Sequence, residues 1–341
     1  MLFRSTETNA ASSNEIQIFD AGEGGSLQLT GQVATGGLGT STGLGNQGAI
    51  ALSRDGRWLF AVNAGSNDIS TFAVTRSGLV LTDKVASGGT RPVSLSVHDN
   101  MVYVLNAGGN GNIAGFALSG YGRLRAIPQS VRPLSSATAG AAQISFSRDG
   151  ETLVVTEKAT NKISTYRVDD GRVSGPTVHA SHGATTFGFA FDRRGDLLVS
   201  EAFGGAANAS ALSSYELDDE DDSGSLELIS GSVATNQTAA CWVVIVGHGR
   251  YAYVTNTGSG TITGFRVSRS GELTRVTADG RTGVTGGGPT DAAASRGGEL
   301  LYILAPSIGQ IVTFRVNGDG SVTRLSSTPG VAGSATGLVV R

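Results

Sequence analysis

The sequence contains one cysteine, Cys241, which excludes an intrachain disulfide and a zinc site built from several thiolates. No apolar run reaches the ~18 residues that a membrane-spanning helix needs, so we expect no membrane partner. Charged residues are scarce, at 16% of 341 residues, and the formal net charge is −3. Because no excess of basic residues attracts polyanions in general, we exclude nucleic acid as a partner.

Glycine, by contrast, is abundant, with 51 residues, and the chain repeats itself. Segments of the form I-x-x-aromatic-x-apolar recur seven times, at steps of 53, 44, 50, 49, 50 and 49 residues. A fixed period of this length is typical of a repeat architecture. The first apolar residues of the seven copies are Ile16, Ile69, Ile113, Ile163, Leu212, Ile262 and Ile311.

Each copy has the same neighbours along the chain. An apolar segment such as ISFS is followed by a turn such as SRDG, then by a second strand, the aromatic strand and a G-x-L-x-L segment. Asp-Gly between short apolar segments is a hairpin signal. Four strands per period predict a blade of a β-propeller, and helices are disfavoured because no segment keeps a 3.6-residue apolar period.

The two ends of the chain complement each other. The N-terminal LFRST fits a second strand without a first, and the C-terminal ATGLVVR fits a first strand alone. We therefore predict an all-β, seven-bladed β-propeller with four-stranded antiparallel blades, one domain over residues 1–341, closed by both termini in one blade. MLFRSTETNA lacks the features of a signal peptide, so this start slightly favours a secreted or periplasmic protein if a signal peptide was removed, and a cytoplasmic one otherwise.

A propeller has two faces, and we place the candidate site on the loop face, where loops join one blade to the next and second strands to third strands. Polar side chains at this face suit a small polar ligand. Residues just before or at the start of the first strands are Gln47, Arg91, Gln143, His182, Phe187, Gln237, Cys241, Trp242, Thr290, Asp291 and Thr336; those ending the second strands are Asn63, Asn106, Glu157, Lys158, Glu201 and Asn256.

Two acids in this set are candidate catalytic groups. Glu157 and Glu201 stand where other blades carry asparagine, so one acts as a general base and the other as a hydrogen-bonding acid, or each forms a salt bridge. His182 is the proton shuttle in the same hypothesis. The predicted ligand-binding residues are Arg91, Gln143, Asn63, Asn106, Asn256, Gln237, Trp242 and Asp291.

Other features are weaker signals. Cys241 lacks a visible base partner and is interpreted as a buried structural thiol, and Trp242 as a stacking surface. His179 and His182 have no carboxylate at a metal-site spacing, so we expect no metal and no cofactor. The acidic run at 218–224 fits a solvated hairpin loop, not a calcium loop. We expect a monomer.

Segments QGAIALSRDGRWLFAVNAGSNDISTFAV, AQISFSRDGETLVVTEKATNKISTYRV and RYAYVTNTGSGTITGFRV resemble the lactonase-type seven-bladed propellers. That family includes propeller-type 6-phosphogluconolactonase and the fungal 3-carboxy-cis,cis-muconate lactonizing enzyme. The resemblance implies a lactone-opening or lactone-closing activity at one end of the central channel.

The chain departs from the family pattern at the site. The family's G-P-R-H segment corresponds to Gly140-Ala141-Ala142-Gln143, so its arginine and histidine are replaced. Its Asn-Glu pair corresponds to Thr156-Glu157 or to Glu157-Lys158, depending on how the preceding turn is aligned. The leading hypothesis is a lactonase-like propeller that binds a small polar ligand and hydrolyses or forms a lactone. The alternative is a non-catalytic secreted or periplasmic binding or scaffold propeller.

Overall fold

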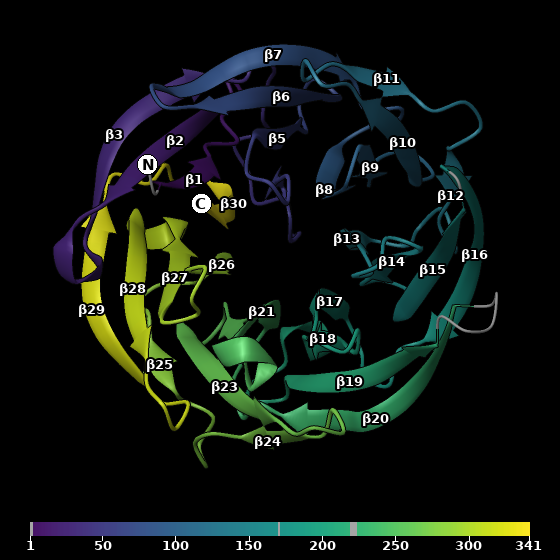
Figure 1. The fold of residues 1–341 in the computed structure, drawn as a ribbon. Helices are drawn as coiled ribbons and strands as arrows, with labels where there is room; N and C mark the ends of the chain where they lie inside the picture. The colour runs from purple at the N-terminus through teal and green to yellow at the C-terminus, as the bar shows by residue number, and fades with distance from the viewer. Residues whose placement is uncertain (1–2, 170, 219–223) are drawn as a thin grey trace.

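The computed structural model describes residues 3–169, 171–218 and 224–341, and the strands of this part of the chain form seven sheets around an axis (Figure 1). Neighbouring strands within each sheet are antiparallel, as in blade 4. The predicted seven-bladed propeller is confirmed. We number the blades 1 to 7 along the chain, and the strands of each blade first to fourth from the axis outward.

Four blades consist of four consecutive strands each. Their strands are β4 (Ile50–Leu52), β5 (Trp58–Asn63), β6 (Asp68–Thr75) and β7 (Gly78–Ala86) in blade 2; β13 (Ala141–Phe146), β14 (Thr152–Glu157), β15 (Lys162–Asp169) and β16 (Arg172–Ala180) in blade 4; β17 (Thr186–Phe191), β18 (Leu197–Glu201), β19 (Ala211–Asp218) and β20 (Ser225–Ala234) in blade 5; and β26 (Asp291–Ala294), β27 (Leu300–Ala305), β28 (Gln310–Val316) and β29 (Val322–Pro329) in blade 7.

In blades 3 and 6 the fourth strand is interrupted, and two short pieces pair with the third strand. The strands are β8 (Pro92–His98), β9 (Met101–Asn106), β10 (Asn112–Leu118), β11 (Leu124–Ala126) and β12 (Arg132–Pro133) in blade 3, and β21 (Ala240–Val246), β22 (Tyr251–Asn256), β23 (Thr261–Val267), β24 (Leu273–Arg275) and β25 (Gly283–Val284) in blade 6. Short 3-10 turns are η1 (Glu23–Gly25), η2 (Phe203–Gly205), η3 (Gly247–Gly249) and η4 (Pro306–Ile308).

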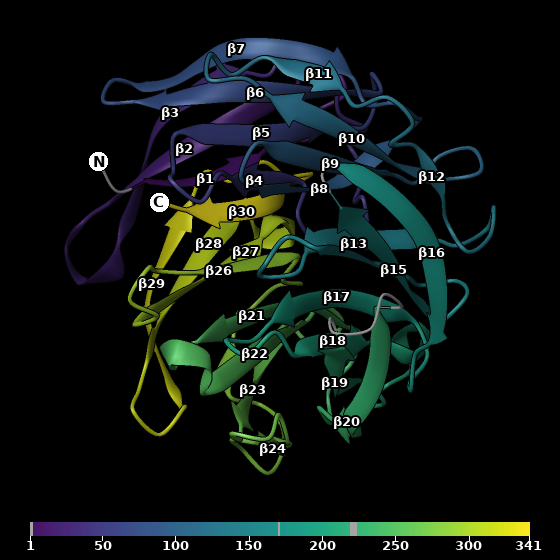
Figure 2. The same ribbon diagram turned by 45° about the vertical axis from the view of Figure 1, so that its right-hand side comes forward.

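Blade 1 contains both ends of the chain, as predicted. Its first strand, β30, pairs with β1, with Ser5 opposite Val339, so the C-terminal segment supplies the strand nearest the axis (Figures 1 and 2). Pairing of this kind removes two open sheet edges and closes the ring. The strands are β30 (Thr336–Val340), β1 (Phe3–Glu7), β2 (Glu15–Ala21) and β3 (Leu27–Ala34).

The repeated sequence motif forms the third strand of every blade. Its first apolar residue and its aromatic residue are buried in all seven copies, because blades pack face to face with their neighbours. Burial of this set supplies the core between the blades. The pairs are Ile16 and Phe19, Ile69 and Phe72, Ile113 and Phe116, Ile163 and Tyr166, Leu212 and Tyr215, Ile262 and Phe265, and Ile311 and Phe314.

The face opposite the loop face is formed by the turns that join first strands to second strands and third strands to fourth strands, and we call it the turn face. In the SRDG turn of blade 2, Gly56 donates its N–H to the Ser53 carbonyl at 2.8 Å and has a φ of 68°. This left-handed conformation suits glycine, which explains the repeated position of that residue.

The loop between β3 and β4 enters the channel at the loop face. Its residues 44–48, which we call the channel loop, contact the first strands of several blades. The Gln47 side chain donates to the Val243 carbonyl at 3.0 Å and accepts from the Val243 N–H at 3.1 Å, in blade 6. Leu95 of blade 3 donates to the Gly48 carbonyl at 2.9 Å, and the Gln47 N–H donates to Ala142 of blade 4 at 3.1 Å. The channel loop therefore crosses the channel.

A cavity of about 240 Å³ lies in the channel, lined by Gln47 and Gly48 of the channel loop and by first-strand residues from five blades. It extends from the channel loop toward the turn face. The predicted hairpin loop at 218–224 lies outside the described residues except at its two ends. Within the described part of the chain, no helix has the length and apolar character to cross a bilayer.

Candidate functional site

The predicted loop-face residues do not form one cluster, and we describe two groups before the remaining residues. The first group surrounds Lys158, which follows β14 at the loop face. The ammonium of Lys158 donates to the Gly45 carbonyl of the channel loop and lies 5.0 Å from the centre of the Phe187 ring. Burial, together with the positive charge of Arg91, lowers the pKa of Lys158 to about 8. Arg91 itself is exposed. The two cations therefore lie near each other beside the channel loop.

Cys241 and Trp242 lie under this group and are buried. The Cys241 thiol donates to the Ala239 carbonyl at 3.2 Å, and burial raises its pKa to about 11. The thiolate needed for a nucleophile is therefore scarce at neutral pH. The Trp242 ring packs on Phe187, with 5.3 Å between ring centres. Trp242 is not exposed, so in this structure it offers a ligand no stacking surface.

The second group consists of the residues that end the second strands. Their side chains are fully buried, and they lie at the same register in six blades. Glu7 at the end of β1 belongs to this group and was missed, although LFRSTE places it at the same position of its repeat. Burial raises the pKa of Glu7 well above its usual range. The six residues are Glu7, Asn63, Asn106, Glu157, Glu201 and Asn256.

Glu157 illustrates what these residues do. Its carboxylate accepts hydrogen bonds from the Ser135 N–H at 3.0 Å, from the Thr160 hydroxyl at 2.8 Å and from the Ser164 hydroxyl at 2.9 Å. Ser135 belongs to the loop that enters blade 4, so Glu157 fixes that loop to the blade. The side chain is 0% exposed and has no free oxygen toward the channel. The geometry assigns Glu157 a positioning function; it does not bring this acid to a ligand at the channel.

Glu201 is held in the same way but is also linked to His182. It accepts hydrogen bonds from the Gly183 N–H at 2.9 Å and from the Ser213 and Ser232 hydroxyls, each at 2.6 Å. The Ser232 oxygen also lies 2.8 Å from Nδ1 of His182. His182, Ser232 and Glu201 thus form a continuous hydrogen-bonded chain, which we call the His182 relay. Two of the three predicted catalytic residues are brought together by a serine that no sequence signal marks.

The hydrogen positions in the His182 relay follow from what each group can donate. An ionised carboxylate only accepts, so the single hydroxyl proton of Ser232 points to Glu201. The Ser232 oxygen then accepts a hydrogen bond from Nδ1–H of His182, and in the neutral imidazole this tautomer has its lone pair on Nε2. His182 is exposed, and its backbone N–H is fixed by the Tyr215 hydroxyl at 2.8 Å. The imidazole therefore lies against the outer strands of blade 5 and not in the channel.

The remaining predicted residues are occupied within the protein. The Gln143 side chain pairs with the backbone of Phe189 in blade 5, at 3.0 and 2.7 Å. Gln237 accepts from the Thr261 hydroxyl at 3.0 Å and donates to the Asp279 carbonyl at 3.0 Å. The predicted convergence of all these residues on one open channel end is not what the structure shows, because the channel loop fills that end and backbone groups use the amides.

Asp291 starts β26 and lines the cavity in the channel. It is 3% exposed, and burial raises its pKa to about 8, although the Ala292 N–H donates to it at 2.7 Å. Because the folded pKa lies above the usual value of 3.8, the carboxyl binds a proton more tightly in the folded state. Stability from this group is present below about pH 4 and is lost as the pH rises to about 8.

We therefore expect Asp291→Asn to raise the free energy of unfolding at pH 9 by roughly 1–3 kcal/mol and to change it little at pH 4, since one pKa unit corresponds to about 1.4 kcal/mol and relaxation absorbs part of the cost. Urea denaturation of both proteins at the two pH values measures this difference. Asp99→Asn, at an exposed turn position, serves as the control. An effect of equal size at both pH values would contradict the explanation.

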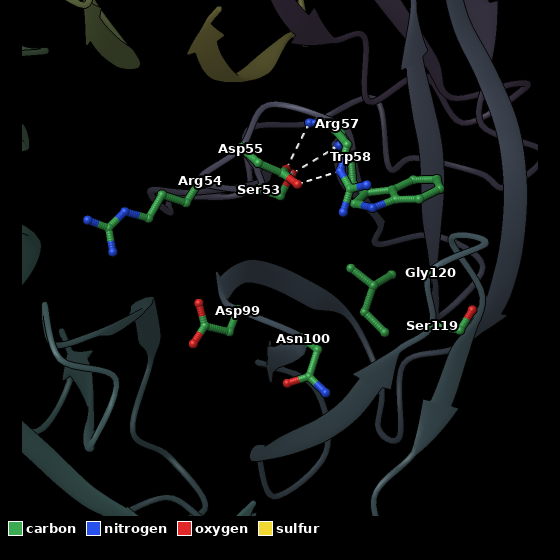
Figure 3. Close-up of a pocket in the computed structure, with 10 residues that line it drawn as sticks. Ser53, Arg54, Asp55, Arg57, Trp58, Asp99, Asn100, Ser119 and Gly120 are labelled. Carbon is green, nitrogen blue, oxygen red and sulfur yellow. Dashed lines mark hydrogen bonds and ion pairs between the residues drawn. The ribbon is translucent and has the colours of Figure 1, made fainter.

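The turn face has cavities that the sequence reasoning did not consider. One, of about 530 Å³, lies between blades 2 and 3 and is lined by the SRDGRW turn, Asp99 and the turn after β10 (Figure 3). The Asp55 carboxylate in this cavity accepts hydrogen bonds from the Ser53 hydroxyl and from Arg57, and these lower its pKa to about 2. Arg54 extends away from Trp58 in the same view. The other carboxylate that lines the cavity, that of Asp99, is exposed and lies 3.9 Å from Nδ1 of His98.

Among residues 3–169, 171–218 and 224–341, no group of three or more His, Cys, Asp or Glu side chains is arranged to hold a metal ion. His179, three residues before His182, instead lies 3.1 Å from the Thr165 hydroxyl. Burial lowers the pKa of His179. Its imidazole is directed toward a neighbouring strand rather than toward His182.

A family model described as the lactonase seven-bladed β-propeller matches residues 11–131 and 110–245 of the chain. The two matches overlap because the blades repeat, and together they span 11–245, more than two thirds of the 341 residues. No curated protein matches the sequence.

Solved structures share the fold over the whole chain. The periplasmic gluconolactonase of Pseudomonas aeruginosa is 18% identical, with 99% of this chain and 98% of that chain covered and a TM-score of 0.77. A proposed 6-phosphogluconolactonase from Bacteroides fragilis is 17% identical, with 100% and 98% covered and a TM-score of 0.77. A protein from Lactobacillus plantarum is 16% identical, with 100% of both chains covered and a TM-score of 0.79. At these identities the likeness establishes the architecture.

Proposed function

Because the chain belongs to the lactonase family of seven-bladed β-propellers, we propose that it hydrolyses a small polar lactone, with His182 as the general base. The observation that carries this proposal is the His182 relay, in which Nδ1 of an exposed imidazole is hydrogen-bonded to Ser232, and Ser232 to Glu201, so that Nε2 is the ring nitrogen left outside the relay. The names of two proteins with the same fold, a gluconolactonase and a proposed 6-phosphogluconolactonase, favour a sugar lactone as the substrate class.

The proposed reaction uses the groups of the His182 relay. Nε2 of His182 takes a proton from water as the water oxygen attacks the lactone carbonyl carbon. The bond between that carbon and the ring oxygen then breaks, and the imidazolium returns the proton to the leaving alkoxide, which gives the hydroxy acid. Glu201 stabilises the imidazolium through Ser232, so both act as positioning residues. The reverse sequence closes a lactone with the same groups.

The test measures lactone turnover in a pH-stat, since each ring opened releases a carboxylic acid. The panel contains glucono-δ-lactone, 6-phosphoglucono-δ-lactone and a muconolactone. We expect saturable hydrolysis of at least one sugar lactone by the purified chain. Turnover of none, together with thermal stabilisation by one of them, would replace the proposal with the alternative of a non-catalytic binding propeller.

The substitution Ser232→Ala tests whether Ser232 contributes to catalysis through the His182 relay or has only a structural role. Loss of the Ser232 hydroxyl breaks the hydrogen-bonded link to Glu201 and frees the imidazole to rotate, so we expect kcat to fall about tenfold or more with KM little changed. Ser77→Ala, in the exposed turn after β6, is the matched control. Equal kcat values for the two variants would remove Ser232 from the mechanism.

A further inference from the structure

The turn face carries basic residues at one repeated position. Counted from the end of the first strand, the second residue of the turn to the second strand is Arg or His in five of the six blades that have such a turn, and Asn100 is the exception. Each of the five is exposed. With a net charge of −3 for the whole chain, this set does not simply reflect a basic composition. The residues are Arg54, Arg148, Arg193, His248 and Arg296.

Four of these residues line one cavity. Arg148, Arg193, His248 and Arg296 come from blades 4 to 7 and surround about 220 Å³ at the turn-face end of these blades. Glycines from the turns of blades 6 and 7 form part of its wall, including Gly247, Gly249 and Gly298. A cavity of this size accommodates a small molecule and not a protein segment or a nucleic acid.

The turns pack against one another, which fixes the cavity. Arg148 donates through Nη1 to the Asp192 carbonyl at 3.3 Å, so the turn of blade 4 is tied to that of blade 5. A Cβ on Gly298 would lie 2.9 Å from the Gly247 nitrogen, and one on Gly249 would lie 3.0 Å from the Arg193 side chain. Glycine is therefore required for this close approach, and it brings the basic residues together.

Acidic groups near the cavity do not neutralise it. Asp192 lines the cavity but is 4% exposed, and its carboxylate is paired with Arg194 at 3.1 Å. Glu299 and Asp149 are exposed on neighbouring turn positions. Within the described residues, the guanidinium groups of Arg193 and Arg296 form no ion pair or hydrogen bond. Two unpaired guanidinium groups beside Arg148 and His248 repel one another, and a bound anion removes that repulsion.

We propose that this cavity binds a small molecule with two or more carboxylate or phosphate groups. Guanidinium groups recognise such groups through paired hydrogen bonds, and three of them from separate blades suit a ligand with more than one anionic end. The site lies on the turn face, whereas His182 lies on the loop face, so it is separate from the proposed hydrolytic site and does not depend on it.

The experiment is isothermal titration of the full chain with citrate and with inorganic pyrophosphate at about 20 mM ionic strength, with acetate as a single-charge probe. We expect saturable binding of citrate or pyrophosphate and none of acetate; the tighter of the two identifies the carboxylate or phosphate class. Arg193→Gln and Arg296→Gln should each weaken that binding about tenfold or more, because a charged hydrogen bond is lost.

The matched control is Arg125→Gln, which removes one exposed guanidinium from β11 in blade 3 and leaves the cavity intact. Its affinity should stay within about twofold of the unchanged protein. Equal weakening by Arg125→Gln and Arg193→Gln would show a diffuse charge effect and overturn the site. Absence of saturable binding of either polyanion up to about 10 mM would overturn it as well.

Discussion

Replacing His182 by glutamine is expected to lower kcat/KM for lactone hydrolysis by a factor of about 10²–10⁴, the usual contribution of a general base. Glutamine keeps a polar side chain of similar length but has no lone pair that accepts a proton at neutral pH. The fall should be in kcat, because proton abstraction is made only in the transition state. Initial rates over a range of lactone concentrations, for both proteins, give the two constants.

His179→Gln is the control for this substitution. It removes the imidazole three residues away, on β16, which is held by Thr165 and is not linked to Glu201. We expect near-unchanged turnover from it, and an unchanged circular dichroism spectrum from both variants. If His182→Gln kept the activity of the His179 variant, the base would have to be sought elsewhere on the loop face.

Replacing Gln47 by alanine is expected to lower the free energy of unfolding by about 2 kcal/mol, because it leaves the N–H and the carbonyl of Val243 without their partner. The same substitution removes the side chain that joins the channel loop to blade 6. The effect is measured as a shift in the midpoint of urea or thermal denaturation.

The control for Gln47→Ala is Thr42→Ala, in the exposed part of the same connection. Among the residues that the structure describes, its hydroxyl hydrogen-bonds only to that of Thr40, at 3.2 Å, so we expect a change below about 0.5 kcal/mol. A large loss from Thr42→Ala, or none from Gln47→Ala, would contradict the importance of the contact between the channel loop and blade 6.

The architecture was predictable because the repeat encodes the same local structure seven times. Ile163 and Tyr166 have equivalents in the other six copies, so an error in the interpretation of one segment would not have changed the period. The complementary ends LFRST and ATGLVVR similarly predicted the pairing of β1 with β30. The strands of the blades and the pairing of the two ends can be predicted from one sequence, because they depend on local sequence patterns or on their repetition.

The positions of the site residues were less predictable. Glu157 and Glu201 were correctly placed at the ends of second strands, but side chains there point into the layer between blades, and serines from other strands decide their partners. Gln47 and His182 were assigned to the same channel end. Gln47 instead reaches a backbone 196 residues away, across the channel, and His182 contacts Ser232 on β20, 50 residues away; both contacts are set by the tertiary fold.

The basic turn residues are a different case, since their signal was present. SRDG occurs twice, and DRRG and SRGG follow it at the same repeat position. The predicted site residues all lie at the loop face, whereas these basic residues lie at the turn face. When charged residues are counted at each position of the repeat, rather than over the whole chain, the basic residues of the turn face become apparent.

The pairing of β1 with β30 also bears on how the protein is made. Arg4 pairs with Val340, so the partner of β1 emerges from the ribosome 336 residues later. At about 5–20 residues per second this is an interval of roughly 20–70 s, during which the nascent ring stays open and β1 presents an unpaired edge. Ring closure therefore cannot be completed during most of translation, and protection of that edge by a chaperone is of most use in this interval.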